Sequence, residues 1–435
     1  MTTTNRTELL DELSWRGLLH QATDEAGLRK HLAESPRRVY AGFDPTADSL
    51  TIGNLVPIMA LRHFRRAGHE PVVVMGGGTG LIGDPSGKSA ERQLQTAEQV
   101  EANVNSQRRI FERLLGFEGV DGGAAGGATI VNNAEWLGKL GYLEVLRDIG
   151  KHFSVNVMIQ RDSVRDRLHG REQGISYTEF SYAILQSYDF LHLFRERGVT
   201  VQLGGSDQWG NIVAGVDLVR RVAREEVFGL TAPLVTKADG GKFGKTESGA
   251  IWLTAERTSP YAYYQFWLNA DDADMPRFLR LFTEMPLEEI EALEAEHAKN
   301  AAARPAHRAL ARHATALLHG EREMERAEAA AAALFTGDVA SLDEATLAEV
   351  FAGAPSSEHG KAELAGEGVA LVDLLPLTSL AKSKREAREF LSGGAVTVNG
   401  KKADLETRLT TGDLLHGRVA LLRRGKKHWH ATRWG

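Results

Sequence analysis

Residues 71–75 (PVVVM) constrain the fold more than any other segment. The run offers no polar side chain to water, begins with a proline and is followed by glycines, as strands covered on both faces do. A short strand at 39–43 and a helix at 55–67 precede it, so together they predict a βαβ unit with a parallel sheet. Open sheets of this kind bind ligands at the carboxyl ends of their strands.

The remaining segments predict three structural domains. Strands at 129–132 and 199–203, with helical patterns between and after them, extend the first unit into an open α/β sheet that carries a helical insertion. Helical periodicity then fills 260–336, and after residue 367 a basic helix and the hairpin signal Asn399-Gly400 indicate a small α+β domain. The expected division is 1–231 (parallel-sheet domain with the helical insertion), 232–259 (linker with the loop KFGKT), 260–336 (all-helical), 337–366 (linker with at most one helix) and 367–435 (small α+β).

Composition excludes several classes of protein. The 435 residues contain no cysteine, which rules out disulfide scaffolds, thiolate zinc sites and cysteine nucleophiles. No apolar run approaches the length of a membrane span and residues 1–5 are polar, so we expect a cytoplasmic protein. The net charge of −6 is unevenly divided: residues 376–435 carry +8 and the rest −14. A basic end indicates either nucleic-acid contact or a solubilising tail.

Two loops contain residues that suit a phosphate ligand. The sequence GGGTG at 76–80 follows the buried strand directly, where glycines allow a ligand to approach the backbone or simply form a tight turn. Lys242 and Lys245 stand three residues apart in a glycine-flanked loop. Both ammonium groups can reach a polyphosphate, although a solvated basic hairpin would have the same sequence.

One helix presents polar groups where a core helix would carry leucine or isoleucine. Tyr182, Gln186 and Asp189 are spaced i, i+4 and i+7, which places them on one face. Burying a phenol, an amide and a carboxylate is costly without polar partners, so this face favours a small polar ligand.

Taken in order, six motifs resemble those of the bacterial tyrosyl-tRNA synthetases, a family of class I aminoacyl-tRNA synthetases. The resemblance runs in one register from about residue 9 to the end of the chain, and six ordered motifs are far more specific than any one alone. They are YAGFDPTADSL (40–50), TIGN (51–54), GLIGDPSGK (80–88), the helix face 182–189, GGSDQWGN (204–211) and KFGKT (242–246).

The resemblance implies a tyrosine–tRNA ligase. It implies that tyrosine and ATP react in a Rossmann-like cleft to form tyrosyl-adenylate and pyrophosphate, and that the tyrosyl group then moves to the 3′-terminal ribose of tRNA(Tyr). The attacking carboxylate is already ionised, so the chemistry needs positioning and charge stabilisation rather than a general base. ATP is then a substrate, Mg²⁺ is held by its phosphates with no protein metal site, and a homodimer with its interface in 135–167 is expected.

By matching position, the resemblance also assigns roles to residues. Tyr40 and Asp189 would contact the phenolic hydroxyl of the substrate. This family is itself the standard example of a hydrogen-bonding site that selects tyrosine over phenylalanine. The other tyrosine contacts would be Asp84, Tyr182 and Gln186 at the ammonium group and Gln202 near the carboxylate. ATP would be held by Gly42, Asp44, Thr51, Gly53, Asn54, Gly205, Asp207, Gln208 and Lys245, and the catalytic set would be Thr46 and Thr51 with Lys242, Lys245, Lys88 and Arg92 at the leaving pyrophosphate.

The chain departs from the family in one motif. Class I synthetases usually carry His-x-Gly-His where this chain has Thr51-Ile52-Gly53-Asn54. The Asn54 amide can place an N–H roughly where an imidazole would, whereas the Thr51 hydroxyl is shorter. We therefore expect activity with a weakened activation step.

The basic C-terminal segment resembles a small RNA-binding fold shared with a ribosomal protein and pseudouridine synthases. In the family this module holds tRNA, and the 260–336 helices read its anticodon side. Its helix would bring four cations to phosphates: Lys382, Lys384, Arg385 and Arg388.

Two other functions compete with an active tyrosine ligase. A catalytically weakened RNA-binding paralogue of the same fold would explain Thr51 and Asn54, but all tyrosine-contacting positions and both loop lysines are present. A tryptophan-specific synthetase is disfavoured by Tyr40 and Asp189, which suit a phenol.

Overall fold

The structure is a computed structural model that describes residues 6–86, 94–117, 127–161, 164–165, 167–168, 174–246, 249–425 and 428–435. The chain packs as two compact units, Met1–Thr258 with Asn269–Ala314, and Ser259–Leu268 with Thr315–Gly435. The helical stretch expected at 260–336 is thus shared between the two units. The finer five-part division of the chain stays a prediction.

The first unit is built on a six-stranded sheet in the order β1-β6-β5-β2-β3-β4, in which only β1 is antiparallel to its neighbour. This confirms the expected parallel α/β class. The chain runs from β2 outward through β3 to β4, then returns to place β5 on the other side of β2. Adjacent strands whose connections leave in opposite directions open a crevice at their carboxyl ends. The strands are β1 (Gln21–Ala22), β2 (Arg38–Phe43), β3 (Glu70–Met75), β4 (Thr129–Asn132), β5 (Val199–Gly205) and β6 (Phe228–Ala232).

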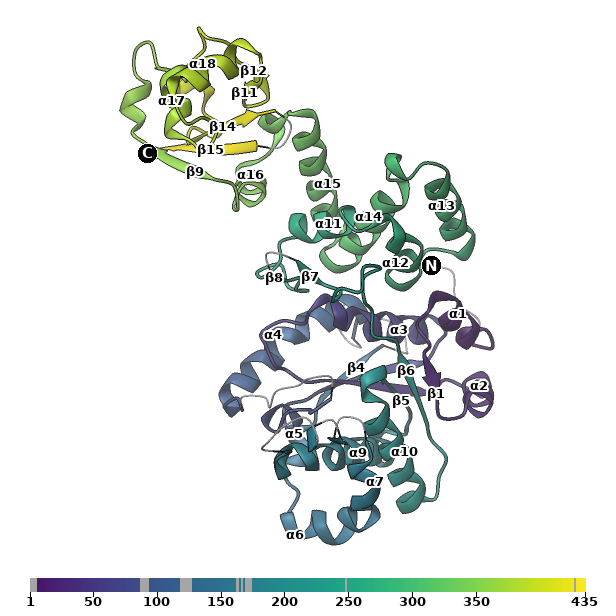
Figure 1. Ribbon diagram of the computed structural model, residues 1–435. Helices are drawn as coiled ribbons and strands as arrows, with labels where there is room; N and C mark the ends of the chain where they lie inside the picture. Colours follow the sequence, from purple (N-terminus) through teal and green to yellow (C-terminus); the bar gives the residue numbers. More distant parts are fainter. Residues whose placement is uncertain are drawn as a thin grey trace. The chain divides into compact units, whose positions relative to one another are not determined.

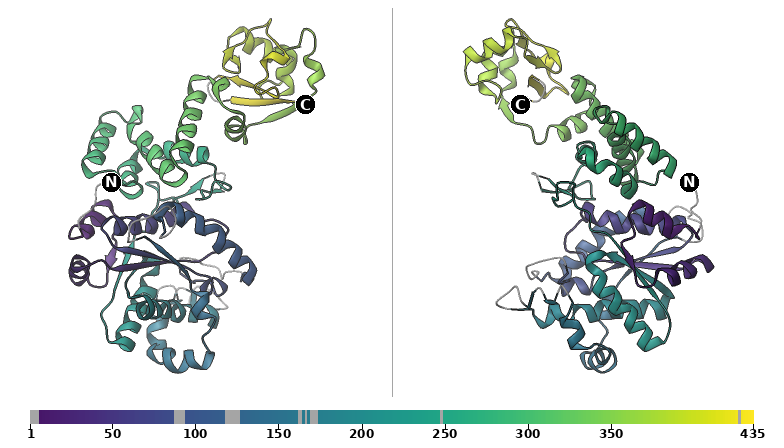
Figure 2. Two further views of the ribbon diagram at one scale, coloured as in Figure 1. Left: turned by 180° about the vertical axis from the view of Figure 1, so that it is seen from behind. Right: turned by 45° about the vertical axis from the view of Figure 1, so that its right-hand side comes forward.

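Helices cover both faces of this sheet, which is why β3 is apolar along its length. Figures 1 and 2 show α3 and α4 on one face and α9 and α10 on the other. The five residues 71–75 are all buried, as predicted for a strand between two helical layers. The helices of this layer structure are α1 (Leu9–Arg16), α2 (Glu25–Glu34), α3 (Leu55–Arg66), α4 (Ala97–Leu115), α5 (Ala134–Leu137), α6 (Tyr142–Glu144), α7 (Val155–Ile159), α9 (Tyr177–Arg197) and α10 (Trp209–Ala223).

A buried arginine ties the N-terminal helix to residues near 280. Arg16, the last residue of α1, donates from Nη1 to the Thr283 carbonyl at 3.0 Å and from Nη2 to the Met285 carbonyl at 2.8 Å. Its Nε donates to Glu12 at 2.9 Å, so the charge is paired inside the protein. The later elements of this unit are β7 (Lys245–Thr246), β8 (Gly249–Ala250), α12 (Met275–Phe282), α13 (Leu287–Lys299) and, to residue 314, α14 (Pro305–His319).

The second unit contains a five-stranded sheet in the order β12-β11-β14-β15-β9. The predicted two-residue hairpin is present, because Asn399 and Gly400 have φ angles of 47° and 87° and join two paired strands. Its elements are α11 (Pro260–Leu268), α15 (Glu321–Thr336), α16 (Glu344–Val350), β9 (Ser356–His359), β10 (Val369–Ala370), α17 (Leu371–Leu374), α18 (Lys384–Ser392), β11 (Val396–Val398), β12 (Lys401–Lys402), β13 (Arg408–Leu409), β14 (Val419–Arg424) and β15 (His428–Trp434).

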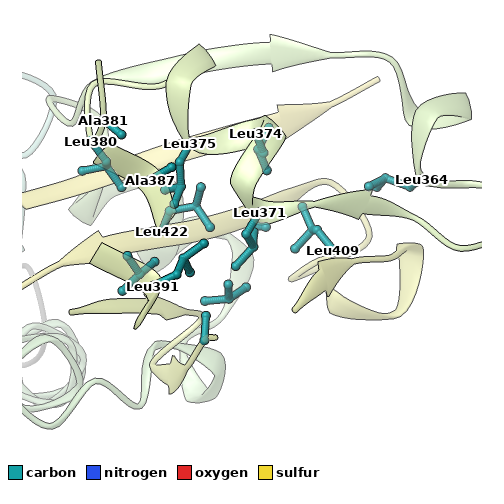
Figure 3. Close-up of a cluster of buried hydrophobic side chains, with 14 of the residues drawn as sticks. Leu364, Leu371, Leu374, Leu375, Leu380, Ala381, Ala387, Leu391, Leu409 and Leu422 are labelled. Carbon is teal, nitrogen blue, oxygen red and sulfur yellow. The ribbon is translucent and has the colours of Figure 1, made fainter. Parts of the chain in front are cut away.

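Alternating residues of β14 serve two separate cores. Ala420 and Leu422 belong to the cluster made with α17 and α18, whose leucine side chains Figure 3 shows beside the strands. Leu421, on the opposite face, packs with alanines of α15 and with Leu347 of α16. A strand buried on both faces therefore joins the C-terminal module to the helices that precede it.

Residues 337–366 differ from the linker that we expected. They contain α16 and also β9, which pairs in parallel with β15 and forms the edge of the C-terminal sheet. The sequence of β9, SSEH, has no apolar alternation, because an edge strand is held by backbone hydrogen bonds more than by side chains. This segment is part of the C-terminal fold rather than a connection to it.

Among the residues that the structure describes, none forms a helix long and apolar enough to cross a bilayer.

The Arg16 contacts predict a large stability effect. Arg16→Met keeps the apolar stem but leaves the buried Thr283 and Met285 carbonyls without this donor and removes one cation from Glu12, and should lower the free energy of unfolding by about 3 kcal/mol. Arg29→Met removes an exposed pair with Asp11 and should cost less than about 1 kcal/mol. Urea denaturation followed by circular dichroism measures both, and equal effects would contradict this interpretation of Arg16.

Candidate active site

A cavity of about 370 Å³ lies where the sheet topology predicts a crevice, at the carboxyl ends of β2 and β5. Tyr40 of β2 and Gln202 of β5 are directly paired in register and both line it. The helix face predicted from spacing is also there, since Tyr182, Gln186 and Asp189 of α9 all line the same cavity. Other predicted site residues in the lining are Gly42, Asp44, Thr46, Thr51, Gly53, Asn54, Asp84, Gly205, Asp207 and Gln208.

A buried carboxylate is found at one wall of the cavity. Asp189 is 3% exposed and accepts hydrogen bonds from Asn133 Nδ2 to Oδ2 at 2.9 Å and from Trp136 Nε1 to Oδ1 at 2.7 Å. Burial raises the pKa of Asp189 to about 7, against the two donors, which lower it. The carboxyl group therefore changes its charge near neutral pH, and it can accept a further hydrogen bond when ionised.

Tyr40 presents its hydroxyl to the same part of the cavity. The side chain is 1% exposed, its ring packs edge-on against Phe190 at 5.3 Å, and its hydroxyl finds no hydrogen-bond partner among the described residues. Burial first, and then the nearby Asp189, raise the pKa of Tyr40 well above its ordinary value, so the phenol stays neutral. A buried hydroxyl without a partner is costly and marks a place where a ligand group would bond.

Asp44 organises the next part of the cavity. It accepts hydrogen bonds from the Tyr182 hydroxyl at 3.0 Å and from Thr79 Oγ1 at 2.8 Å. A β carbon on Gly76 would stand 2.3 Å from Asp44 Oδ1, so glycine is required there by this carboxylate. The close approach that the GGGTG sequence predicted is therefore made by the protein's own Asp44.

Asp84 is a second buried carboxylate in the lining of the cavity. Its Oδ2 accepts from Gln208 Nε2 at 2.6 Å, and its Oδ1 accepts from the Ser86 backbone N–H at 2.9 Å. The Oε1 atoms of Gln186 and Gln202 are buried and have no partner among the described residues. Carboxylates and amide oxygens that surround one space favour a cationic or hydrogen-bond-donating group within it.

The TIGN motif forms a short turn before α3. Asn54 Oδ1 accepts from the Thr51 backbone N–H at 3.1 Å and from Thr51 Oγ1 at 3.0 Å. Since the amide oxygen is used in this way, the Nδ2 hydrogens of Asn54 are the group that can be offered to a phosphate. The two replaced positions of the motif are thus bonded to each other.

The lysine loop borders the cavity without filling it. Phe243 contributes to the lining, whereas Lys242 and Lys245 on either side of it are exposed. Lys88 and Arg92, predicted to assist them, lie outside the residues that the structure describes.

The predicted RNA contacts belong to the second unit. Lys382, Lys384, Arg385 and Arg388 are all exposed at the start of α18. Lys384 Nζ pairs with Asp373 at 2.6 Å across the surface. An exposed cluster of this kind can contact phosphates without desolvation.

Three residues of the site were not predicted from sequence. Asn133 bonds Asp189, Thr79 and the Gly78 backbone, Trp136 bonds Asp189, and Thr79 bonds Asp44. Asn133 follows β4 and Thr79 follows β3. The rule that ligands bind at the carboxyl ends of parallel strands was a usable signal for both.

Family comparison connects this cleft to a known group. Residues 32–336 match the protein family described as "tRNA synthetases class I (W and Y)". Residues 346–432 match a second family, described as "Tyrosine--tRNA ligase SYY-like C-terminal domain".

Individual relatives match along their whole length. The chain is 49% identical to the tyrosine–tRNA ligase of Roseiflexus castenholzii over 428 residues, which is 98% of this chain and 99% of that protein. It is 50% identical to that of Geobacillus stearothermophilus over 429 residues, 98% of this chain and 100% of that protein.

Solved structures show the same fold. A C-terminally truncated mitochondrial tyrosyl-tRNA synthetase of Aspergillus nidulans superimposes with a TM-score of 0.68 at 31% identity, covering 75% of this chain and 94% of that one. An Archaeoglobus fulgidus tyrosyl-tRNA synthetase complexed with L-tyrosine gives a TM-score of 0.54 at 18% identity, covering 73% and 99%, which bears on the fold alone.

The raised pKa of Asp189 predicts a pH-dependent stability. The folded protein holds a proton that the unfolded chain releases near pH 4, so stability from this group is present below pH 4 and is lost as pH rises to about 7. The difference in unfolding free energy between the protein and its Asp189→Asn variant should change over this window, by at most about 1.4 kcal/mol per pH unit. Chemical denaturation at pH 4 to 8 measures it, and a constant difference would refute the assignment.

Proposed function

The chain belongs to the tyrosine–tRNA ligases of the class I tRNA synthetases, and from this premise we propose how the residues of the cleft divide the reaction. A tyrosine carboxylate oxygen attacks the α-phosphorus of ATP, the bond to the β-phosphate breaks, and pyrophosphate leaves. A ribose hydroxyl of tRNA then attacks the carbonyl carbon of the adenylate and AMP leaves. Neither step needs a covalent bond to the protein, so a chain without cysteine can carry out both.

The observation that carries the tyrosine assignment is that Asp189 and Tyr40 both line the same part of the cavity. An ionised, buried Asp189 offers an acceptor for the phenolic hydroxyl, and the Tyr40 hydroxyl lacks a partner among the described residues. A phenol can bond both, whereas phenylalanine would leave the Tyr40 hydroxyl without a partner and would add no donor to Asp189, which keeps only Asn133 and Trp136. Tryptophan has no hydroxyl to offer, which supports tyrosine as the amino acid.

The opposite end of tyrosine carries a positive charge and a carboxylate. We propose that Asp84 and the partnerless Oε1 of Gln186 bind the ammonium group, with Tyr182 beside them. Tyr182 bonds Asp44 in this structure, so its hydroxyl oxygen keeps lone pairs for an ammonium N–H. Gln202 then lies near the tyrosine carboxylate, at the strand end beside Tyr40.

The nucleotide would occupy the rest of the cleft. We assign Gly42, Asp44 and Gly205 to the adenylate region and Asp207 and Gln208 to the ribose. The turn formed by Thr51, Gly53 and Asn54, together with Thr46, would donate to the phosphates. Lys242 and Lys245 would move from the rim onto the leaving pyrophosphate, with Lys88 and Arg92.

Mg²⁺ is assigned to the phosphates rather than to a protein site. The Asp44 and Asp84 carboxylates already accept hydrogen bonds from protein groups, while cations suited to phosphates stand at the rim. When bound, Mg²⁺ would offset charge on the departing pyrophosphate. In the described part of the chain, the group of three candidate metal ligands, Asp272, His297 and His307, does not line the cleft, and both imidazoles contact backbone carbonyls.

A second copy of the chain is proposed to cover an apolar surface near residues 142–159. Several large apolar side chains there are exposed, which is unusual for a protein surface unless a partner buries them. They include Tyr142, Leu143, Leu146, Val155, Val157 and Ile159. We also propose a cytoplasmic location, since ATP and tRNA are the co-substrates.

Amino-acid selection tests the site. Tyr40→Phe removes one hydrogen bond to the phenol and should reduce the preference for tyrosine over phenylalanine about tenfold. The measurement is kcat/KM in ATP–pyrophosphate exchange with tyrosine, phenylalanine and tryptophan. Tyr188→Phe is the control: Tyr188, on α9, lines a different cavity, so this variant should keep the preference. Absence of tyrosine-dependent exchange in the unaltered protein would favour the weakened paralogue.

tRNA binding by the second unit is tested by charge reversal in the full-length chain. Changing Lys382, Arg385 and Arg388 together to Glu should raise KM for tRNA about tenfold or more and flatten its salt dependence, with tyrosine activation unaltered. Arg322→Glu is an exposed control on α15. An unchanged KM for tRNA would remove these residues from the interface.

A further inference from the structure

Two signature segments far apart in the sequence are joined by backbone hydrogen bonds. The Ile52 N–H donates to the Ile251 carbonyl at 2.9 Å, and the Ile251 N–H donates to the Gly244 carbonyl at 2.9 Å. Thr51 of the TIGN turn also forms an antiparallel β-bridge with Trp252, the residue after Ile251. The segment 251–253 therefore lies between the TIGN turn and the KFGKT loop and holds both.

A direct side-chain contact reinforces this link at Gly244. Gly244 has a φ of 75°, and a β carbon placed on it would lie 2.2 Å from Ile52 Cγ2. Ile52 is fully buried, so it has little freedom to withdraw. Glycine is needed at 244 for its backbone angle and also because the Ile52 methyl occupies the space of a side chain.

The residue before Gly244 fixes the loop on its other side. The Phe243 ring stacks on Phe282 at 5.1 Å with a 12° angle between planes, and it contacts Phe278 of the same helix, α12, at 5.1 Å. Phe243 also lines the cleft. The centre of the KFGKT loop is thus anchored by Phe243 and Gly244, while the lysines on either side of these two residues are exposed.

We propose that Ile52 and Gly244 are positioning residues that set the distance of the lysine loop from the phosphate-binding turn. A side chain added at position 244 would push the loop away from Ile52. It would displace Lys242 and Lys245 relative to Thr51 and Asn54 without touching the tyrosine pocket. The inference rests on the proposed function, because it assigns both segments to the ATP phosphates. It adds that Ile52, an apolar residue with no contact to the reacting atoms, controls pyrophosphate departure through the loop.

The first test introduces a methyl group at the contact. Gly244→Ala should slow tyrosyl-adenylate formation about tenfold or more, because small displacements of positioning groups have large effects on rate. Gly240→Ala is the matched control: Gly240 has a similar φ of 80°, but nothing lies within 4 Å of its added β carbon. It carries the same backbone strain without the collision, and should stay within about threefold of the unaltered rate.

The second test restores space at the contact. Ile52→Leu removes the Cγ2 methyl group from Cβ. The loss of rate caused by Gly244→Ala should therefore be about fivefold smaller in the Ile52→Leu background than in the unaltered protein. Ile52→Val keeps this methyl group and should leave the Gly244→Ala effect at full size. Such a double-mutant cycle isolates the coupling between the two positions from their separate effects.

Stopped-flow measurement of adenylate formation, with the equilibrium Kd for tyrosine, decides the outcome. Slow activation, tyrosine Kd within about twofold, and rescue by Ile52→Leu alone support the proposal. Equal rates for Gly244→Ala and Gly240→Ala, loss of tyrosine binding in Gly244→Ala, or equal effects in the Leu and Val backgrounds overturn it. Failure of the unaltered protein to form tyrosyl-adenylate would instead refute the proposed function.

Discussion

The pairing of β2 with β5 is the constraint on which the rest of the first unit depends. The two strands run in parallel, but the chain leaves them toward opposite edges of the sheet, so no connection covers their carboxyl ends. Tyr40 and Gln202 become neighbours there, α9 supplies the polar wall, and the TIGN turn begins α3 at the rim. A single topological feature thus brings together residues from these four separate segments.

Periodicity and spacing were enough to predict the framework and one wall of the site. The parallel sheet followed from the apolar run at 71–75, and the shared face of Tyr182, Gln186 and Asp189 followed from helix geometry. These features are local, because a strand period or a helix face is set by neighbours in the chain. Roles that rested on the family resemblance remain proposals about ligands.

Other features depend on contacts that sequence spacing does not encode. Asn133 and Trp136 donate hydrogen bonds to Asp189 from a segment about fifty residues earlier in the chain. Neither residue type predicts a carboxylate partner. The sequence predicts a linker where the structure has β9. The strand is held by pairing with β15 through backbone groups, which every residue possesses, so its side chains give no signal. At Gly76 the group that comes close is Asp44, which the glycine-rich sequence at 76–80 did not distinguish from a ligand.

Trp136 gives the protein an optical reporter of its own. The indole is 7% exposed, donates to a carboxyl group that titrates near neutrality, and stacks on His192 at 4.5 Å with an 18° angle between rings. We therefore expect its emission to respond to the charge of Asp189 on one side and to the histidine on the other. Six further tryptophans contribute background, so a variant that keeps only Trp136 would follow the state of this pocket without any attached label.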